Sequence, residues 1–163
     1  MKTEKRRRRE AKTDYNSRLV MLKSNLPRVV FRKTNKYILG QYVKSNEAKD
    51  KVEIGVSSKE LLKYGFSKEL TGSLKSLPAA YLTGFLLGKK ILEKDEKAKA
   101  ILDIGIIRSI PKTRTFAFLN GVVDAGVNIS HKKETFPDEA RIRGRHMKNN
   151  IDMDKIKGKI TNE

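Results

Sequence analysis

The sequence predicts a single mixed α/β domain, flanked by a basic N-terminal arm and a polar C-terminal tail. A length of 163 residues is enough for one hydrophobic core and marginal for two. Three short runs with strand character come first, and a long apolar segment with helical spacing follows them. Another strand-like run comes after that segment, which is typical of a sheet with helices packed on its faces.

The composition divides the chain into three parts. Residues 1–12 contain no large apolar side chain besides the initiator Met, so we expect a disordered basic arm. Residues 13–130 contain the periodic apolar segments and should form the globular domain. Residues 131–163 are polar and basic again and should form a C-terminal extension.

The globular part should begin with a short helix and three strands. Thr13 or Asp14 can cap a helix that ends near Ser24, because Pro27 cannot continue it. β-Branched and aromatic residues then predict successive strands, and Thr34-Asn35 suits a tight turn between the first two. Short connections of this kind favour an antiparallel meander. The expected strands are 27–33, 36–44 and 51–56.

Helical periodicity dominates the next segment. Ser57 can cap a short helix at 59–64. Apolar residues then recur at helical spacing between Ser73 and Lys94. This long helix should begin near Pro78, since proline is tolerated only in the first turn.

The remaining segments complete the predicted domain. An apolar run at 98–107 predicts a buried strand, and 116–125 predicts a helix that stops at Gly126. A short helix is expected at 138–145, whereas 149–163 offers little to pack. The predicted core consists of Leu74, Leu77, Tyr81, Phe85, Ile101, Leu102, Ile104, Phe118, Leu119 and Val122.

The charge indicates the class of partner. The formal net charge is +18. Residues 1–36 carry thirteen Lys or Arg and three Asp or Glu, so a net charge of +10 lies in less than a quarter of the chain. A chain with this excess repels itself unless a polyanion neutralises it, which favours nucleic acid as the partner over an anionic membrane surface.

Several protein classes do not fit the composition. The chain has no cysteine, which excludes disulfides and thiolate chemistry, and His131 and His146 alone do not suggest a zinc site. No signal peptide is recognisable. The most apolar run, 79–92, is interrupted by two lysines and is shorter than the roughly 20 residues of a membrane span. We therefore expect a cytoplasmic protein without a membrane partner or a cofactor.

Basic side chains on the arm and the first strand are candidates for contact with nucleic acid. The arm carries Arg6–Arg9 and Lys12. Arginine suits this role, because it presents a planar donor fork to phosphate and stacks on exposed bases. Arg28 and Arg32 share one face of the first predicted strand, with Val30 between them, and this spacing suits a sheet surface against a phosphate backbone. A second basic cluster lies near the C-terminal end.

Two sets of residues leave alternatives open. Tyr37 and Tyr42 could stack on bases or pack in the core. Asp103 and Asp124 could suggest paired carboxylates for metal-assisted hydrolysis. No nucleophile–base pair or phosphate-binding loop accompanies these carboxylates, so we expect no enzyme, no catalytic or metal-binding residue and no small-molecule substrate.

Six segments occur in order along the chain: RRRREAKTDYNSRL, PRVVFRKTNKYI, LPAAYLTGFLLGKK, AILDIG, LNGVVDAGVNISH and FPDEARIRGRHM. Together, over residues 5–148, they resemble the archaeal and eukaryotic branch of universal large-subunit ribosomal protein family eighteen, which binds 5S rRNA. The short tail is similar to that of archaeal members. The resemblance implies a three-layer α/β/α domain with a mixed, ribonuclease-H-like sheet that lacks catalysis. A ribonuclease-H-like, metal-dependent nuclease is the alternative.

The resemblance also implies a role in translation, as a structural constituent of the large ribosomal subunit in the cytoplasm. There the protein would bind 5S rRNA and help attach it to 23S rRNA in the central protuberance. Its protein neighbours would include the other 5S rRNA-binding protein. The residues that match the family's arm and first hairpin, and that we expect to bind RNA, are Arg6, Arg7, Arg8, Arg9, Lys12, Thr13, Tyr15, Arg18, Arg28, Arg32, Asn35 and Lys36. Those of the closing motif are Arg141, Arg143, Arg145 and His146.

Overall fold

The computed structural model describes residues 3–47, 49–66, 74–145 and 151–161. Five strands form one sheet: β1 (Arg28–Lys33), β2 (Ile38–Asn46), β3 (Lys49–Ser57), β4 (Lys99–Asp103) and β5 (Asn128–Ile129), in the order β3-β2-β1-β4-β5. β1 and β3 each pair antiparallel with β2, whereas β4 pairs parallel with both β1 and β5. The mixed sheet and the antiparallel meander of its first three strands are therefore confirmed.

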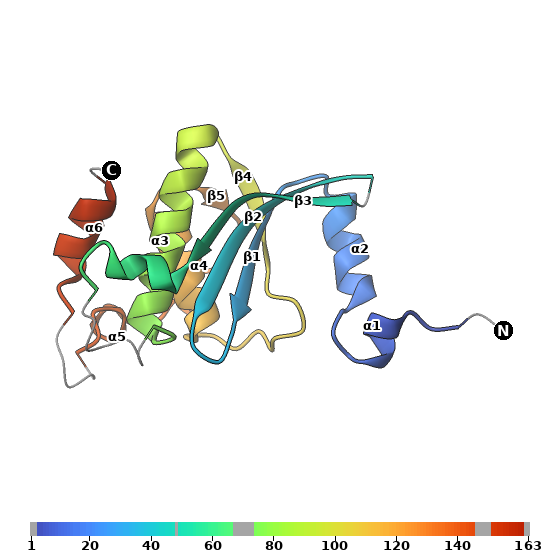
Figure 1. The fold of residues 1–163 in the computed structure, drawn as a ribbon, viewed down its shortest axis with the longest axis horizontal. Helices are drawn as coiled ribbons and strands as arrows, with labels where there is room; N and C mark the ends of the chain where they lie inside the picture. Colours follow the sequence, from blue (N-terminus) through green and yellow to red (C-terminus); the bar gives the residue numbers. More distant parts are fainter. Residues whose placement is uncertain (1–2, 48, 67–73, 146–150, 162–163) are drawn as a thin grey trace.

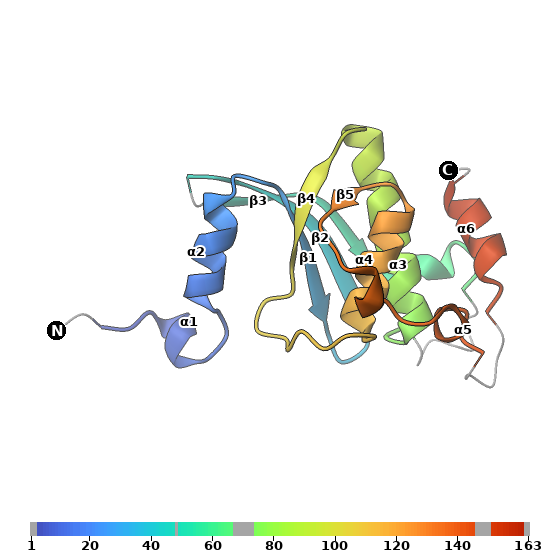
Figure 2. The same cartoon turned by 180° about the vertical axis from the view of Figure 1, so that it is seen from behind.

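Helices lie on both sides of this sheet (Figures 1 and 2). α3 (Leu77–Lys94) and α4 (Arg114–Asp124) lie on one side, and α2 (Tyr15–Lys23) lies on the other. This confirms the three-layer α/β/α arrangement, although α2 contributes no buried residue to it. The ribonuclease-H-like topology stays a prediction. The other helices are α1 (Arg6–Arg9), α5 (Glu139–Ile142), α6 (Met153–Thr161) and the 3₁₀ turns η1 (Ser58–Leu62) and η3 (Lys133–Thr135).

Capping side chains fix where several helices begin. The Ser57 hydroxyl accepts the Lys59 backbone N–H, and Glu60 completes a capping box at the start of η1. The predicted cap is confirmed, but η1 is a 3₁₀ turn and ends at Leu62, earlier than expected. Ser76 caps α3, and Pro78 lies in its first turn, as the sequence predicted.

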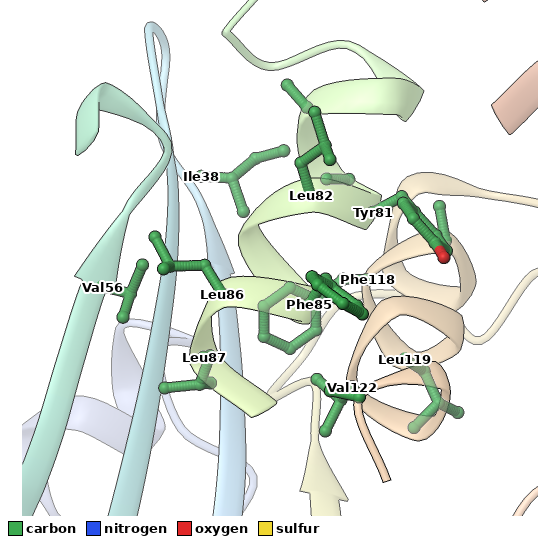
Figure 3. Close-up of a cluster of buried hydrophobic side chains, with 14 of the residues drawn as sticks. Ile38, Val56, Tyr81, Leu82, Phe85, Leu86, Leu87, Phe118, Leu119 and Val122 are labelled. Carbon is green, nitrogen blue, oxygen red and sulfur yellow. The ribbon is translucent and has the colours of Figure 1, made fainter. Parts of the chain in front are cut away.

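The hydrophobic core lies between the sheet and the α3–α4 pair. Figure 3 shows Leu86 and Leu87 of α3 beside Ile38 and Val56 of the sheet. Side chains alternate across β1, so Val29 and Phe31 face this core and are only 0% and 1% exposed. The predicted core members on α3 and α4, with the preceding Leu74, are confirmed as buried: Leu74, Leu77, Tyr81, Phe85, Phe118, Leu119 and Val122.

Two glycines allow α3 and α4 to approach closely. A Cβ atom at Gly84 would overlap with the Phe118 carbonyl oxygen, and a Cβ atom at Gly121 would overlap with the Tyr81 carbonyl oxygen. Each glycine therefore lies directly against the backbone of the other helix. This contact fixes α4 on α3 and makes the pair a rigid support for the sheet.

The strand predicted at 98–107 is wrong beyond Asp103, where β4 ends. Gly105 has a φ of +66°, and its backbone N–H donates to the Asp103 carboxylate at 2.9 Å, which turns the chain away from the sheet. Ile106 is consequently 60% exposed. The predicted core membership of Ile101, Leu102 and Ile104 is also wrong in degree, since all three are only partly buried.

The prediction that the tail has little to pack is wrong for its described part. Met153, Ile156 and Ile160 of α6 are 5%, 4% and 5% exposed. Their spacing places them on one helix face, and α6 packs with this face against α3. The Lys157 ammonium lies 4.6 Å from the centre of the Tyr81 ring on α3. Helix α6 of the C-terminal extension thus packs on the globular domain.

Candidate nucleic-acid interface

The N-terminal arm forms a helical turn beside the start of α2. All four arginines of α1 are exposed. The Lys5 ammonium and the Arg8 guanidinium carbon lie 4.8 Å and 5.8 Å from the centre of the Tyr15 ring, and Arg7 Nε donates to Thr13 Oγ1 at 2.8 Å. The arm is therefore helical at residues 6–9, where we expected no regular structure. Its disorder in the absence of RNA stays a prediction.

Asp14 fixes the first turn of α2. Its carboxylate accepts the backbone N–H groups of Asn16 and Ser17 at 3.0 Å and 3.2 Å, and the Ser17 hydroxyl at 2.6 Å. The hydrogen bond from the Ser17 hydroxyl is the main reason that the pKa of Asp14 lies below its ordinary value. An ionised cap is retained at neutral pH, and the helix that it starts directs Arg18 toward the sheet.

A continuous arginine–aspartate network connects α2 with three strands. Arg18 donates to Asp50 of β3 at 2.8 Å, and the other Asp50 oxygen accepts Arg28 of β1 at 2.7 Å. Arg28 also donates to Asp103 of β4 at 2.9 Å, and the second Asp103 oxygen accepts Arg32 at 3.0 Å. Helix α2 buries no residue of its own, so this arginine–aspartate network fixes its position relative to the sheet.

The pKa of Asp50 reflects its place in this network. Burial disfavours the charged carboxylate, but hydrogen bonds from Ser45 and Arg28 favour it. The positive charges of Arg28 and Arg18 act in the same direction. The pKa of Asp50 is therefore below its ordinary value, and the carboxylate is held in its ionised, ion-paired state.

Arg28 lies in the interior of this network and not on the surface where we expected it. Its side chain is 4% exposed, and its guanidinium is bound to Asp103, Asp50 and Ser45. The shared face of Arg28 and Arg32 is confirmed, because both donate to the Asp103 carboxylate. Only Arg32, whose side chain is 42% exposed, remains accessible to a phosphate. Arg28 therefore contributes to the interface indirectly, by holding Asp50 and Asp103 in place.

The hairpin between β1 and β2 presents Asn35 and Lys36 at its exposed tip. The Thr34 hydroxyl closes this turn, since it donates to the Tyr37 carbonyl oxygen at 2.8 Å and accepts the Tyr37 N–H at 2.9 Å. The hairpin tip, α1 and the loop after β4 all lie along the lower edge of the molecule in both views (Figures 1 and 2). Basic residues far apart in the sequence are thus presented along one edge.

A hollow of about 430 Å³ lies between the arm and α2 on one side and β1 with the end of β4 on the other. Six of the residues expected to bind RNA line it, and the remaining lining residues come from α2 and its cap Asp14, from Asp103 at the end of β4 and from the loop after β4. The six are Arg7, Lys12, Thr13, Arg18, Arg28 and Arg32. We call this feature the basic hollow.

The second basic cluster is not part of this arrangement. It lies at α5, on the opposite side of α3 from the arm (Figures 1 and 2). Arg143 forms ion pairs with Glu139 at 2.9 Å and with Asp154 at 3.4 Å, whereas Arg141 and Arg145 are exposed. His146 lies outside the described residues. Contacts of this cluster with RNA stay a prediction.

The carboxylates considered for hydrolysis are separated and already bonded. Asp103 belongs to the arginine–aspartate network, and Asp124 accepts the Tyr81 hydroxyl at 2.6 Å. Among the described residues, no three His, Cys, Asp or Glu side chains are placed to hold a metal ion. The geometry therefore gives no support to a metal-dependent nuclease in this part of the chain. None of the described helices combines the length and apolarity that a membrane crossing requires.

The structure places Tyr42 in the core, whereas stacking of Tyr37 on a base stays a prediction. Tyr42 is 2% exposed and belongs to the core, and Tyr37 is partly buried against it. Sequence reasoning missed Asp50, because a lysine-flanked aspartate near the beginning of a strand has no distinctive pattern. It misread Ile106 and Ile107 as strand residues, since apolar side chains normally indicate burial.

Comparisons with known proteins give a consistent result. A family model described as ribosomal large subunit proteins 60S L5 and 50S L18 matches residues 1–101. A large ribosomal subunit protein uL18 from Korarchaeum cryptofilum is 49% identical over 142 residues, which cover 87% of this chain and 70% of that protein. The uL18 proteins of Methanothrix thermoacetophila and Methanospirillum hungatei are 47% and 42% identical over 85% and 87% of this chain, and over 79% and 78% of their own lengths.

Proposed function

Because this chain belongs to the family of large-subunit ribosomal proteins that comprises 60S L5 and 50S L18, on its archaeal branch, we propose that it binds 5S rRNA through the arm and the basic hollow. It is a structural protein of the large ribosomal subunit in the cytoplasm. In the proposed role it helps attach 5S rRNA to 23S rRNA in the central protuberance, next to the other 5S rRNA-binding protein. No catalytic step is proposed.

The observation that carries the proposal is the convergence of cations on the basic hollow. Arg7 and Lys12 come from the arm, Arg18 from α2 and Arg32 from β1. Separate elements thus present positive charge toward one space, where a phosphate backbone can approach several of them at once. A solvated charged surface would not require this convergence. The exposed arginines of α1 extend the same positive surface outward.

The mechanism combines a rigid platform with a mobile arm. The core and the arginine–aspartate network fix Arg18 and Arg32 before RNA arrives, so little side-chain entropy is lost when they bind phosphate. The described part of the arm, residues 3–12, has no buried residue, and the arm orders fully only on RNA, which costs part of the contact energy. Recognition is then mainly of backbone and shape, with Tyr15 and a few unstacked bases adding site preference.

The proposed contacts follow from this placement. Arg28 acts indirectly, by holding Asp50 and Asp103 in position. Exposed Arg141 and Arg145, with Arg143 beside them, are proposed to contact a second RNA segment on the other side of the domain. The direct contacts to 5S rRNA are Arg6, Arg7, Arg8, Arg9, Lys12, Thr13, Tyr15, Arg18, Arg32, Asn35 and Lys36.

A salt titration of 5S rRNA binding tests the proposal. The full chain is compared with a chain that lacks residues 1–12 and with a variant in which Arg6–Arg9 are replaced by glutamine. Each phosphate contact that is lost should flatten the plot of log K against log salt by about 0.7–0.9, so the quadruple variant should lose a slope of roughly 3. A matched control replaces four exposed lysines outside the arm by glutamine: Lys59, Lys63, Lys75 and Lys97.

The controls separate specific binding from general charge. The lysine control should retain most of the slope and the preference for 5S rRNA over an unrelated duplex RNA of equal length. Equal losses in the arm variant and the lysine control would contradict a localised interface. Equal affinity of the full chain for both RNAs would contradict 5S rRNA as the partner.

A further inference from the structure

The basic hollow has an apolar wall that phosphate binding does not explain. Met21 of α2 and Ile104, Ile106 and Ile107 of the loop after β4 line it. Ile106 and Ile107 are 60% and 37% exposed. Exposed isoleucines in a strongly charged surface cost hydration free energy and indicate a contact that the free protein lacks.

These isoleucines are held in a defined place. The loop leaves β4 through the turn at Gly105, whose N–H donates to the Asp103 carboxylate at 2.9 Å. The same carboxylate, 6% exposed, is bound by Arg28 and Arg32. Arg32 also donates to the Asp103 carbonyl oxygen at 3.1 Å. The root of the loop is therefore tied to the arginine–aspartate network, and the apolar wall is pre-formed beside Arg18 and Arg32.

The size and charge of the basic hollow limit what can occupy it. Its volume, about 430 Å³, lies at the lower end of the range of about 300–1,000 Å³ typical of small-ligand sites. The rim carries Arg7, Lys12, Arg18 and Arg32, so the occupant is anionic, and the isoleucine wall requires that it also presents an apolar face. A single nucleotide has both properties, since its phosphate is negative and its base has a π-face.

We propose that the basic hollow receives one unstacked nucleotide of the bound RNA, with its base against Ile106 and Ile107 and its phosphate at the cationic rim. This inference rests on the proposed function, because it names the part of the RNA that occupies the site. The polar lining then reads the edge of the base. The Asp14 carboxylate accepts exocyclic amino N–H groups, and the hydroxyls of Thr13 and Ser17 lie next to it.

Such a contact gives the protein a preference for a bulge or loop over a regular duplex. Extruding a base costs a few kilocalories per mole in a paired helix and much less where the base is already unpaired. A nucleotide that is unpaired in the free RNA therefore enters the basic hollow at the lowest cost. The cationic rim alone would bind any phosphate backbone and give no such preference.

The test compares two isoleucine variants of the full chain. The double variant Ile106→Ser, Ile107→Ser removes the apolar wall, whereas Ile110→Ser removes an isoleucine that is 52% exposed in the same loop and does not line the basic hollow. Affinity for 5S rRNA is measured across a salt series. The double variant should bind about tenfold more weakly, the loss typical of one stacked base, with an unchanged salt slope. The Ile110 control should stay within about twofold of the wild type.

A second readout locates the nucleotide. Acylation of RNA 2′-hydroxyl groups is mapped on 5S rRNA bound to each protein, at concentrations that saturate binding. One or two unpaired nucleotides should differ in reactivity between the wild type and the double variant, and the Ile110 control should match the wild type. Circular dichroism and the thermal midpoint should be the same in all three proteins, because the substituted side chains are exposed.

Two results would overturn this inference and leave the proposed function intact, whereas a third would overturn both. Wild-type-like affinity and reactivity in the double variant would show that no base contacts the wall, for example because an acidic protein segment occupies it. Weaker binding with a flattened slope would show that the substitutions acted through the cations. Absence of selective, salt-sensitive binding by the wild type would overturn the proposed function itself, and this inference with it.

Discussion

Arg28 and Asp103 form a buried ion pair whose disruption should strongly destabilise the domain. Their side chains are 4% and 6% exposed, and the bond between them is 2.9 Å long. Removing one partner of such a pair leaves a buried charge without compensation and typically costs about 3–5 kcal/mol. Arg28 keeps Asp50 and Ser45 as partners, so we expect the lower end, about 3 kcal/mol, for Asp103→Leu. In a domain of this length the thermal midpoint should fall by about 6–12 °C.

The assay is a double-mutant cycle on the free protein. The free energy of unfolding of each variant is measured by urea unfolding, monitored by circular dichroism. Arg28→Met keeps the apolar stem of the side chain, and Asp103→Leu keeps the volume of the carboxylate. The double variant leaves neither of the two charges buried without its partner, so it should cost less than the sum of the two single variants by at least about 2 kcal/mol. An exposed pair gives the control: Lys112→Gln with Asp138→Asn, 51% and 65% exposed, should couple by less than about 1 kcal/mol. If the costs at Arg28 and Asp103 add within about 0.5 kcal/mol, the structural role assigned to this pair is refuted.

Two further predictions concern helix packing and pH. Gly84→Ala should destabilise the domain by about 1–3 kcal/mol or more, because the new methyl group meets the Phe118 carbonyl oxygen. The control, Gly55→Ala, places its methyl group in open space and should have little effect on the urea midpoint. Asp50 has a lowered pKa in the folded state, so its contribution to stability is present above the ordinary pKa of about 4 and is lost as the pH falls through the folded pKa. The stability difference between wild type and Asp50→Asn should therefore shrink between pH 6 and about pH 3 in urea unfolding, and a constant difference would contradict this assignment.

Local patterns in the sequence were sufficient for most of the secondary structure. The apolar spacing between Ser73 and Lys94, the position of Pro78 and the capping Ser57 predict elements that the structure contains. These features depend on residues a few positions apart, and such interactions are nearly the same in any fold. The prediction failed after Asp103, where the turn at Gly105 separates the strand from two isoleucines that continue its apolar composition, Ile106 and Ile107.

The sequence was sufficient to predict which charged residues belong to the candidate site, but not which of them are buried or ion-paired. A net charge of +10 in the first 36 residues indicates nucleic acid without any structure. The sequence placed Arg28 beside Arg32 on one strand face, and both do reach the same carboxylate. It could not show that Arg28 is buried, because its partners Asp50 and Asp103 lie 22 and 75 positions away.

By itself, the sequence determined the α/β class, the central helices, the class of partner and the ribosomal family. These properties follow from composition, from short-range periodicity and from six segments that occur in order along the chain and resemble those of the family. Only the tertiary structure decided which arginines face solvent, that Asp50 and Asp103 connect α2 to the sheet, and that the exposed isoleucines lie beside the cations. The physical reason is that burial and ion pairing depend on contacts between segments that are far apart in the sequence, and local patterns do not specify those contacts.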